Sequence, residues 1–324
     1  MQVFRSLEEI PAGFGPTVVA IGNFDGVHRG HCAIVASVRE RARELGAKSV
    51  ALTFDPHPVR LLRLAQAPKL ITPLEVRLGL LAATGLDATV VIPFTPEFSQ
   101  LSAEDFAAGV LRRRLRAVEV HEGDSFRFGH NASAGIAELR ELGGALGFSV
   151  ITHGAIRVGR LAVSSSEIRR RVAAGDVSTA RRLLGRPFSI CATQARGRGI
   201  GSRLTVPTIN LAAYDELLPA DGVYVTRLRV GDAAAVFDGV TNAGVRPTFG
   251  DPSYAVETYL LNFDPATHGV ELTAETPLEL CFLKRLRGER KFETPEALKA
   301  QILQDVGRAQ RLFALSRVFA SPAE

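Results

Sequence analysis

The stretch Ile21-Gly-Asn-Phe-Asp-Gly-Val-His-Arg-Gly-His31 decides the fold of the first half of this chain. The five residues that lead into it, 17–21, are mostly apolar and predict a short buried strand. Residues 31–45 carry apolar side chains at helical spacing, and Gly46 ends that helix. A glycine-rich segment between a strand and a helix N-terminus is typical of a phosphate-binding site.

The alternation of strands and helices continues from this stretch through the first half of the chain. The pattern predicts strands at 48–54, 88–93, 117–121 and 148–152, and helices near 73–84, 103–114, 134–145, 164–175 and 177–184. Such alternation predicts an α/β, Rossmann-like domain whose parallel sheet is covered by helices on both faces. Ligands of such sheets bind at the carboxyl ends of the strands, so we expect a site after the first two strands.

The pattern changes after Pro187. Short strand-like runs at 222–228, 234–238 and 255–263 are separated by Gly, Pro and Asn turns, which predicts a compact antiparallel β-barrel or sandwich. A final helix is expected from Thr294-Pro295 to about Leu315. We expect an apolar stripe of this helix to pack on the barrel: Leu298, Ile302, Val306 and Phe313. The predicted domains are therefore 1–186 and 187–324.

The composition narrows the class of protein. Hydrophobic residues make up 46% and charged residues 23%, which is typical of a globular enzyme and not of a disordered chain. The first 13 residues contain no apolar core of a secretory signal, and no stretch reaches the roughly 18 apolar residues of a membrane helix. We expect a cytoplasmic protein. The formal net charge of +5 favours anionic partners such as nucleotides. The three cysteines form no CxxC pair and indicate neither disulfides nor a zinc site.

Two histidines end the opening stretch. His28 and His31 stand three residues apart, so their imidazoles can converge on one point and stabilise phosphate oxygens as charge builds up. Direct nucleotidyl transfer needs no nucleophilic side chain, only alignment and charge stabilisation. A single loop histidine is more often structural, but the pair stands together with Gly22, Gly26 and Gly30, which let the backbone turn.

A second candidate site lies in the barrel, at Pro207-Thr-Ile-Asn210. The hydroxyl of Thr208 and the amide oxygen of Asn210 are hard donors that suit Mg²⁺, although Pro-Thr-x-Asn alone also fits a plain turn. Phosphorylation of an alcohol needs a carboxylate that accepts the proton, and Glu257 is our candidate base. Strand periodicity alone leaves open that Glu257 faces solvent.

The first half resembles the adenylyltransferase domain of bacterial FAD synthetases. The likeness covers the opening stretch and then, in order, Thr53-Phe-Asp-Pro-His-Pro58, Phe126-Arg-Phe-Gly129 and Ser164-Ser-Ser-Glu-Ile-Arg169. The resemblance implies that Asn23, His28 and His31 bind the phosphates of ATP. It also implies that Ser165, Ser166 and Arg169 hold the triphosphate from the other side, with Gly22 and Gly26 in the binding loop.

The second half resembles the riboflavin kinase barrel. The likeness runs through 218–224, Thr241-Asn-Ala-Gly-Val-Arg-Pro-Thr-Phe249, Val256-Glu257 and Leu286-Arg-Gly-Glu-Arg-Lys-Phe292. Gly197-Arg-Gly-Ile-Gly201 resembles the family's glycine-rich phosphate cradle, which implies binding roles for Gly199 and Gly201. Arg287 and Glu289 match the flavin-side loop, and Asn242 is expected to bind substrate.

Together the two resemblances imply FAD synthesis in two steps. Riboflavin and ATP would give FMN in the barrel, and FMN and ATP would then give FAD and pyrophosphate in the first domain, with Mg²⁺ as cofactor. The expected partners are these small molecules, with no nucleic acid or membrane, in a chain that is a monomer or associates weakly with itself.

Two alternatives stay open. Ser125 and residues 130–134 depart from the family pattern, so the chain could be a riboflavin kinase that has lost the first activity. A nucleotide- or RNA-binding protein without catalysis is the other alternative. It would need stacking aromatics among basic residues, but the sequence has no Trp and only four Tyr.

Overall fold

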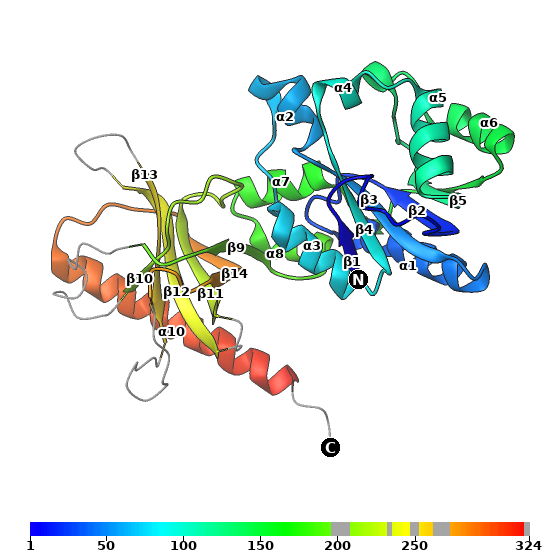
Figure 1. Cartoon of the computed structure of the whole chain (residues 1–324). Coiled ribbons are helices and arrows are strands. Elements are labelled where there is room, and N and C mark those ends of the chain that lie inside the picture. Colours follow the sequence, from blue (N-terminus) through cyan, green and yellow to red (C-terminus); the bar gives the residue numbers. More distant parts are fainter. Residues whose placement is uncertain (196–207, 232–234, 247–252, 262–272, 321–324) are drawn as a thin grey trace. The chain divides into compact units, whose positions relative to one another are not determined.

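The computed structural model describes residues 1–195, 208–231, 235–246, 253–261 and 273–320 (Figure 1). The chain folds as two compact units, Met1–Ser165 and Ser166–Glu324. No helix of these residues is long and apolar enough to cross a membrane.

The first unit is built on a six-stranded sheet in which every neighbouring pair is parallel. Its strands are β1 (Gln2–Phe4), β2 (Thr17–Ile21), β3 (Lys48–Asp55), β4 (Ala88–Pro93), β5 (Ala117–Gly123) and β6 (Ser149–His153). The order is β1-β4-β3-β2-β5-β6, so the chain winds outward in both directions from the boundary between the neighbouring strands β2 and β5. This boundary is the topological switch point, where open α/β sheets bind their ligands.

Helices cover both faces of this sheet, which confirms the predicted α/β class. On one face α1 (Arg29–Glu44) and α3 (Leu74–Ala83) pack on apolar residues of β2 and β3. On the other face η2 (Phe106–Arg114) and α6 (Ile136–Leu146) enclose a larger aromatic core. The remaining short elements are α2 (Pro58–Leu62), η1 (Leu64–Gln66), α4 (Pro96–Ser99), α5 (Ala103–Asp105), η3 (His130–Ala132) and the hairpin β7 (Arg157–Val158) and β8 (Leu161–Ala162).

The second unit combines two helices, a six-stranded antiparallel sheet and a long last helix. The helices are α7 (Ser165–Ala173) and α8 (Val177–Leu184), and the last helix is α10 (Pro295–Ala320). The strands are β9 (Phe188–Ala192), β10 (Thr208–Asn210), β11 (Gly222–Val230), β12 (Ala235–Arg246), β13 (Ser253–Leu260) and β14 (Leu278–Arg287), in the order β10-β13-β12-β11-β14-β9.

The outer two strands of this sheet meet and close it, which confirms the predicted barrel. The backbone N–H of Ala195 donates to the carbonyl of Asn210 at 2.9 Å, and that of Ala212 donates to the carbonyl of Thr193 at 2.9 Å. These bonds join the chain after β9 to the end of β10. A closed barrel leaves no unpaired sheet edge at this seam.

The predicted apolar stripe of α10 is wrong at its N-terminal half. Leu298 and Ile302 are exposed, whereas Val306 is partly buried and Phe313 is buried against the barrel. The buried positions of the helix instead repeat every four residues and include two polar side chains: Gln301, Asp305, Ala309 and Phe313. The apolar pattern missed this face because hydrogen bonds to partners elsewhere in the unit allow the polar residues to be buried.

Two candidate active sites

The loop between β2 and α1 is held in a conformation that ordinary residues avoid. Phe24 and Val27 have φ values of 47° and 35°, and Gly26 has a φ of 85°. A β-branched residue such as Val27 is a rare outlier in the left-handed region. Such strain persists only where the surroundings over-determine the backbone, and it gathers at functional sites.

A buried carboxylate fixes this loop. Asp25 is 1% exposed and accepts hydrogen bonds from the backbone N–H groups of Ile71 and Thr72, each at 3.0 Å. The hydroxyl of Thr72 accepts from the N–H of Gly26 at 3.0 Å. The hydroxyl of Ser165 donates to the carbonyl of Asp25 at 2.9 Å, so this predicted phosphate-binding residue contacts the loop backbone. Charge-assisted bonds of this kind are the strong ones in proteins.

A buried arginine joins the loop to the second family landmark. Arg77 of α3 is 1% exposed and donates to the carbonyls of Asn23 at 2.8 Å and of Phe54 at 3.3 Å. Burial lowers the pKa of this guanidinium from its ordinary value. Arg77 was not predicted from the sequence. The available signal was a charged residue within the mainly apolar helix 74–83.

The two histidines lie together, as their spacing predicted. Their rings stack with centroids 3.6 Å apart and an angle of 14° between the planes. Nδ1 of His28 accepts from the backbone N–H of His31 at 3.2 Å, so His28 also caps α1. Burial, with His28 and Arg77 nearby, holds the pKa of His31 well below its usual range.

Two polar atoms of the predicted phosphate-binding residues are buried without a hydrogen-bond partner in the described part of the chain, as is Nε of the neighbouring Arg77. They are Nδ1 of His31 and the side-chain oxygen of Asn23. Buried polar groups are normally bonded, and such exceptions are expected where a ligand supplies the partner. Both residues were predicted from sequence to bind phosphates.

The three glycines of the loop have different roles. A Cβ on Gly30 would stand 3.1 Å from Cε1 of His28, so this position must stay small for the imidazole to lie where it does. Gly26 has a φ of 85°, a backbone conformation that glycine adopts at no steric cost. Gly22 would place a Cβ at an ordinary 3.6 Å from the ring of Phe24, so space does not demand a glycine there.

A second buried carboxylate lies at the switch point. Oε1 of Glu122, at the end of β5, accepts from the backbone N–H of Ile21 at the end of β2, at 2.7 Å. Glu122 is buried, and burial raises its pKa well above the usual value. This residue was also missed, because a single Glu near a strand end has no distinctive pattern.

A polar cluster lies close by on β5 and β6. Glu119 accepts from Arg41 of α1 at 2.8 Å and lies 2.9 Å from His121, whose other ring nitrogen lies 3.0 Å from His153. The hydrogen bond from Arg41 contributes most to lowering the pKa of Glu119 to about 2. Burial lowers the pKa of both His121 and His153. These groups support the sheet beside the histidine loop.

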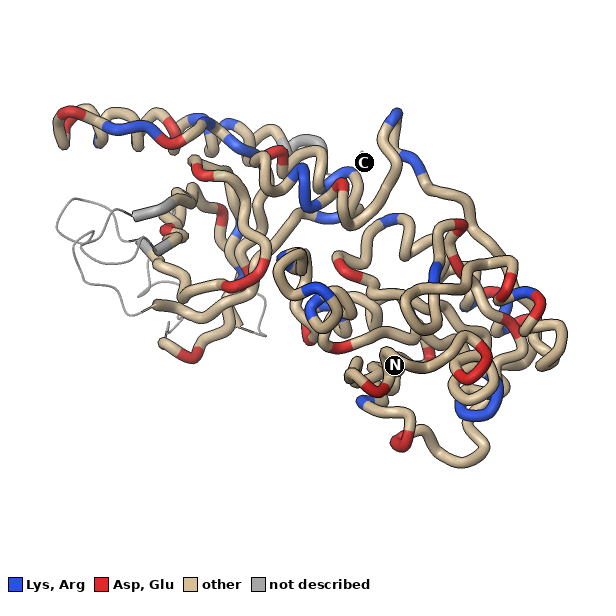
Figure 2. Tube along the Cα trace, turned by 90° about the horizontal axis from the view of Figure 1, so that it is seen from above, with Lys and Arg blue, Asp and Glu red and all other residues tan. Residues whose placement is uncertain are grey.

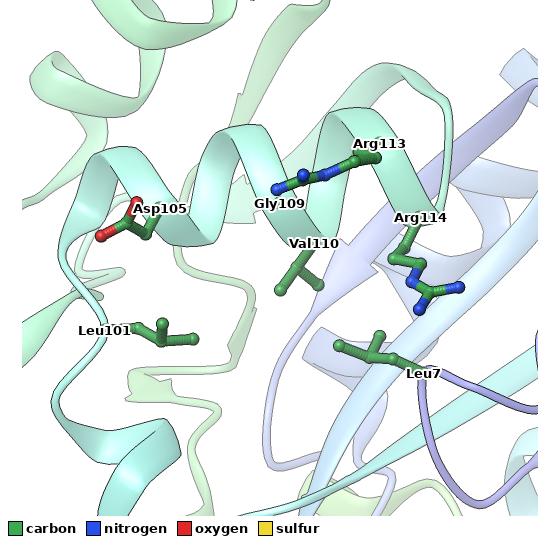
Figure 3. Close-up of a pocket in the computed structure, with 7 residues that line it drawn as sticks. All are labelled: Leu7, Leu101, Asp105, Gly109, Val110, Arg113 and Arg114. Carbon is green, nitrogen blue, oxygen red and sulfur yellow. The ribbon is translucent and has the colours of Figure 1, made fainter.

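A hollow with a volume of about 560 Å³ lies along η2 (Figure 3). Figure 3 shows its lining side chains, which include the apolar Leu7, Leu101 and Val110 and the basic Arg113 and Arg114. None of the predicted site residues lines it. The first candidate site is therefore the histidine loop and not this hollow.

In the second unit, strand register brings three predicted residues into one row. Asn210 of β10 pairs with Glu257 of β13, which pairs with Asn242 of β12. Directly paired residues of antiparallel strands point to the same face of a sheet, so the metal-ligand candidate, the candidate base and Asn242 share one face. Glu257 and Asn210 are half-buried and Asn242 is exposed. The row continues through Val223 to Arg287 of β14.

The segment after β14 turns back toward this row. A Cβ on Gly244 would stand 3.0 Å from Oε2 of Glu289, so the carboxylate lies against the backbone of β12, two residues from Asn242. Arg287 is bound to the buried Asp305 of α10, with 2.9 Å between Nε and Oδ2. The structure thus brings the two flavin-side candidates, Arg287 and Glu289, close to the strands that carry the other kinase candidates.

The remaining predicted residues are placed only in part. Thr208 begins β10, but its side chain lies outside the described residues, as do Gly199 and Gly201. Ser166 is exposed and Arg169 half-buried near the start of α7, both in the second unit.

Comparison with known proteins defines the class of each half. Residues 11–167 match the family model of FAD synthetase, and residues 184–313 match that of riboflavin kinase. A solved structure described as a macrolide-efflux protein from Streptococcus pneumoniae has the same fold, with a TM-score of 0.82 over 95% of this chain and 98% of that one. At 24% identity, this likeness concerns the fold alone.

The curated relatives combine both halves. The bifunctional riboflavin kinase/FMN adenylyltransferase of Pseudomonas fluorescens is 35% identical over 98% of this chain and 99% of its own length. The protein of the same name from Escherichia coli K12 is 31% identical over 93% of this chain and 94% of its own. The chain belongs to the bifunctional riboflavin kinase/FMN adenylyltransferase family.

Proposed function

We propose that this chain makes FAD in two steps. The second unit transfers the γ-phosphoryl group of ATP to riboflavin and gives FMN and ADP. The first unit then joins the AMP part of a second ATP to FMN and releases pyrophosphate. The observation that carries this proposal is that both family models match in order, over units that each hold a candidate catalytic group.

In the adenylyl transfer, a phosphate oxygen of FMN attacks the α-phosphorus of ATP and pyrophosphate leaves. His28 and His31, presented at the start of α1, stabilise the charge that builds on the phosphate oxygens. The buried, unpaired Nδ1 of His31 supports this role, because a phosphate oxygen would accept a hydrogen bond from this nitrogen when it carries the proton. Asn23 is proposed to donate to a phosphate through its side-chain nitrogen. Gly22, Gly26, Ser165, Ser166 and Arg169 complete the proposed triphosphate site.

In the kinase step, Glu257 accepts the proton of the riboflavin hydroxyl as its oxygen attacks the γ-phosphorus. Asn210 lies opposite Glu257, so an amide oxygen and a carboxylate share one face. Hard oxygen donors in small number suit Mg²⁺, which takes its other ligands from water and phosphates. We assign the ion to Thr208 and Asn210. When bound, it neutralises charge on the phosphate oxygens. Gly199, Gly201, Asn242, Arg287 and Glu289 are proposed to contact ATP or the flavin.

We further propose a functional boundary between residues 186 and 187, close to where the riboflavin kinase match begins. The proposed partners are the substrates alone, without nucleic acid, in a cytoplasmic chain that is a monomer or associates weakly. Basic and acidic residues alternate along much of the chain (Figure 2), which supports this choice.

A timed chromatographic assay tests both reactions. The purified protein is incubated with riboflavin, ATP and Mg²⁺, and in parallel with FMN, ATP and Mg²⁺. We expect FMN and then FAD from riboflavin, and FAD directly from FMN. FMN without FAD would support the monofunctional kinase alternative, and no product in either reaction would overturn the proposal.

A further inference from the structure

The buried face of α10 carries two polar residues. Asp305 is 1% exposed and Gln301 9% exposed, on the side of the helix that also buries Ala309 and Phe313. A carboxylate buried in this way is costly unless other groups bond to it. A helix that served only to cover the barrel would need apolar residues at these positions.

Both polar residues bind residues 287–292, a segment that begins at Arg287, the last residue of β14. Oδ2 of Asp305 accepts from Nε of Arg287 at 2.9 Å, and Oδ1 of Asp305 accepts from Nε2 of Gln301 at 3.1 Å. The side-chain oxygen of Gln301 in turn accepts from Nη2 of Arg290. One connected network therefore joins two turns of the helix to two arginines of the segment.

Further contacts hold the same segment. The guanidinium groups of Arg287 and Arg290 lie 5.7 and 4.6 Å from the ring centroid of Phe292, within the range of cation–π attraction. Arg308, one turn beyond Asp305 on α10, donates to the carbonyl of Leu286 at 3.4 Å. The segment is thus bound to the helix at its beginning and in its middle.

The segment in turn reaches the strands of the proposed kinase site. Arg287 occupies the row that contains Asn242 and Glu257, and the carboxylate of Glu289 lies against Gly244 of β12. A displacement of Arg287 or Arg290 would therefore move Glu289 relative to the row. α10 itself contributes no group to the row.

We propose that Asp305 and Gln301 are positioning residues for riboflavin phosphorylation, which fix residues 287–292 in the conformation that receives the flavin. The proposal rests on the kinase function proposed above. It predicts that these residues control riboflavin binding and leave proton transfer by Glu257 and adenylyl transfer in the first unit unchanged.

Single variants test this division. Asp305→Asn keeps the volume of the side chain but removes its charge, and Gln301→Ala removes the second link. We expect the KM for riboflavin to rise roughly ten- to hundredfold in Asp305→Asn, because hydrogen bonds to charged groups contribute that much. The kcat, the KM for ATP and the rate of FAD formation from FMN should stay within about twofold of the parent protein. The matched control for Gln301→Ala is Gln304→Ala, on the exposed side of the same helix, which should leave all values unchanged.

A readout that needs no turnover accompanies the kinetics. Trypsin cleaves after Arg290 and Lys291, and both residues are exposed. Asp305→Asn and Gln301→Ala should speed cleavage there, as followed by mass spectrometry, while Gln304→Ala should not. A double variant with Arg287→Ala tests whether Asp305 acts through Arg287: the riboflavin KM of the pair should match that of Arg287→Ala alone.

Each result separates the two proposals. If the parent protein makes no FMN, the kinase function is wrong and this inference falls with it. If the parent makes FMN but Asp305→Asn leaves the riboflavin KM and the tryptic cleavage unchanged, the inference alone is wrong. Equal losses of kcat, of ATP affinity and of thermal stability would likewise overturn it, because they would mean that Asp305 only stabilises the fold.

Discussion

The two candidate sites are built in different ways. In the first unit the catalytic candidates come from one continuous stretch, which a buried Asp25 and a buried Arg77 hold in strained backbone conformations. In the second unit Asn210, Glu257 and Asn242 come from three separate strands that strand register brings together, and a contact with α10 holds Arg287 beside them. The first site depends on buried charged groups that are bonded to the loop, and the second depends on pairing between residues distant in sequence.

The largest effect is expected from the barrel row. Glu257→Gln removes the proposed base but keeps the volume, so FMN formation should fall by about 10²–10⁴-fold. FAD formation from FMN should be unchanged, as measured by the same chromatographic assay. Glu279→Gln, on β14 of the same barrel, is the matched control. A comparable loss of both activities in Glu257→Gln would contradict the separation of the two sites.

The histidine loop should show the reverse pattern. His28→Ala combined with His31→Ala should lower FAD formation by about 10²–10³-fold, since each removed donor to a developing charge has a large effect. FMN formation should be retained. His130→Ala, in the η3 turn, provides a control. A double variant that makes FAD at the parental rate would refute the mechanism of the first unit.

Removing the buried arginine tests the design of the loop. Arg77→Met removes the guanidinium donors to the carbonyls of Asn23 and Phe54. The carbonyl of Asn23 then keeps only the 3.3 Å bond from the hydroxyl of Thr53, and a buried group that loses its partner costs about 1–3 kcal/mol. We expect slower FAD formation and a lower melting temperature of the first unit, with FMN formation intact. Arg77→Lys should recover part of both losses. If Arg77→Met leaves FAD formation unchanged, the loop does not depend on this anchor.

A pH change should affect the two units unequally. His31, His121 and His153 have pKa values lowered in the folded state, so the unfolded chain binds protons first and stability is lost as the pH falls below about 6.5. Glu122 acts in the opposite direction because burial raises its pKa. The described residues of the second unit contain no histidine. Amide hydrogen exchange at pH 7.5 and 5.5 should therefore show a loss of protection concentrated in the first unit.

The Glu122→Gln variant sharpens this expectation. It removes the group that binds protons more readily in the folded state, so the loss of protection on acidification should become steeper. A shallower loss would mean that the folded chain does not hold Glu122 in its protonated form.

The smallest effect is expected at Gly22. Gly22→Ala meets ordinary contacts and no positive φ, so it should change stability by less than about 1 kcal/mol. Gly30→Ala would push on the ring of His28 and should lower FAD formation clearly more. If Gly22→Ala and Gly30→Ala lower the rate of FAD formation equally, the space around the ring of His28 is not critical.

The sequence predicted the parallel sheet, the barrel and the histidine pair because these depend on local patterns. Strand and helix periodicity predicts where the elements lie. The residues of a contiguous motif have a spacing that is read directly from the sequence. Arg77, Glu122 and Asp305 could not be predicted, because each depends on a partner that is distant in sequence or on the packing of another element. For the same reason the stripe of α10 was misjudged: buried polar residues look like exposed ones until their partners are known.

The closure of the barrel has a consequence for how its parts can be exchanged. The chain leaves the wall at Ala195 and returns with β10, and the bond from Ala195 to Asn210 shows that these two points are neighbours. Any connection from the end of β9 to the start of β10 therefore has only a short distance to span. A longer or shorter replacement changes the closure entropy only slowly with length. The length of this connection can therefore be changed without redesigning the barrel.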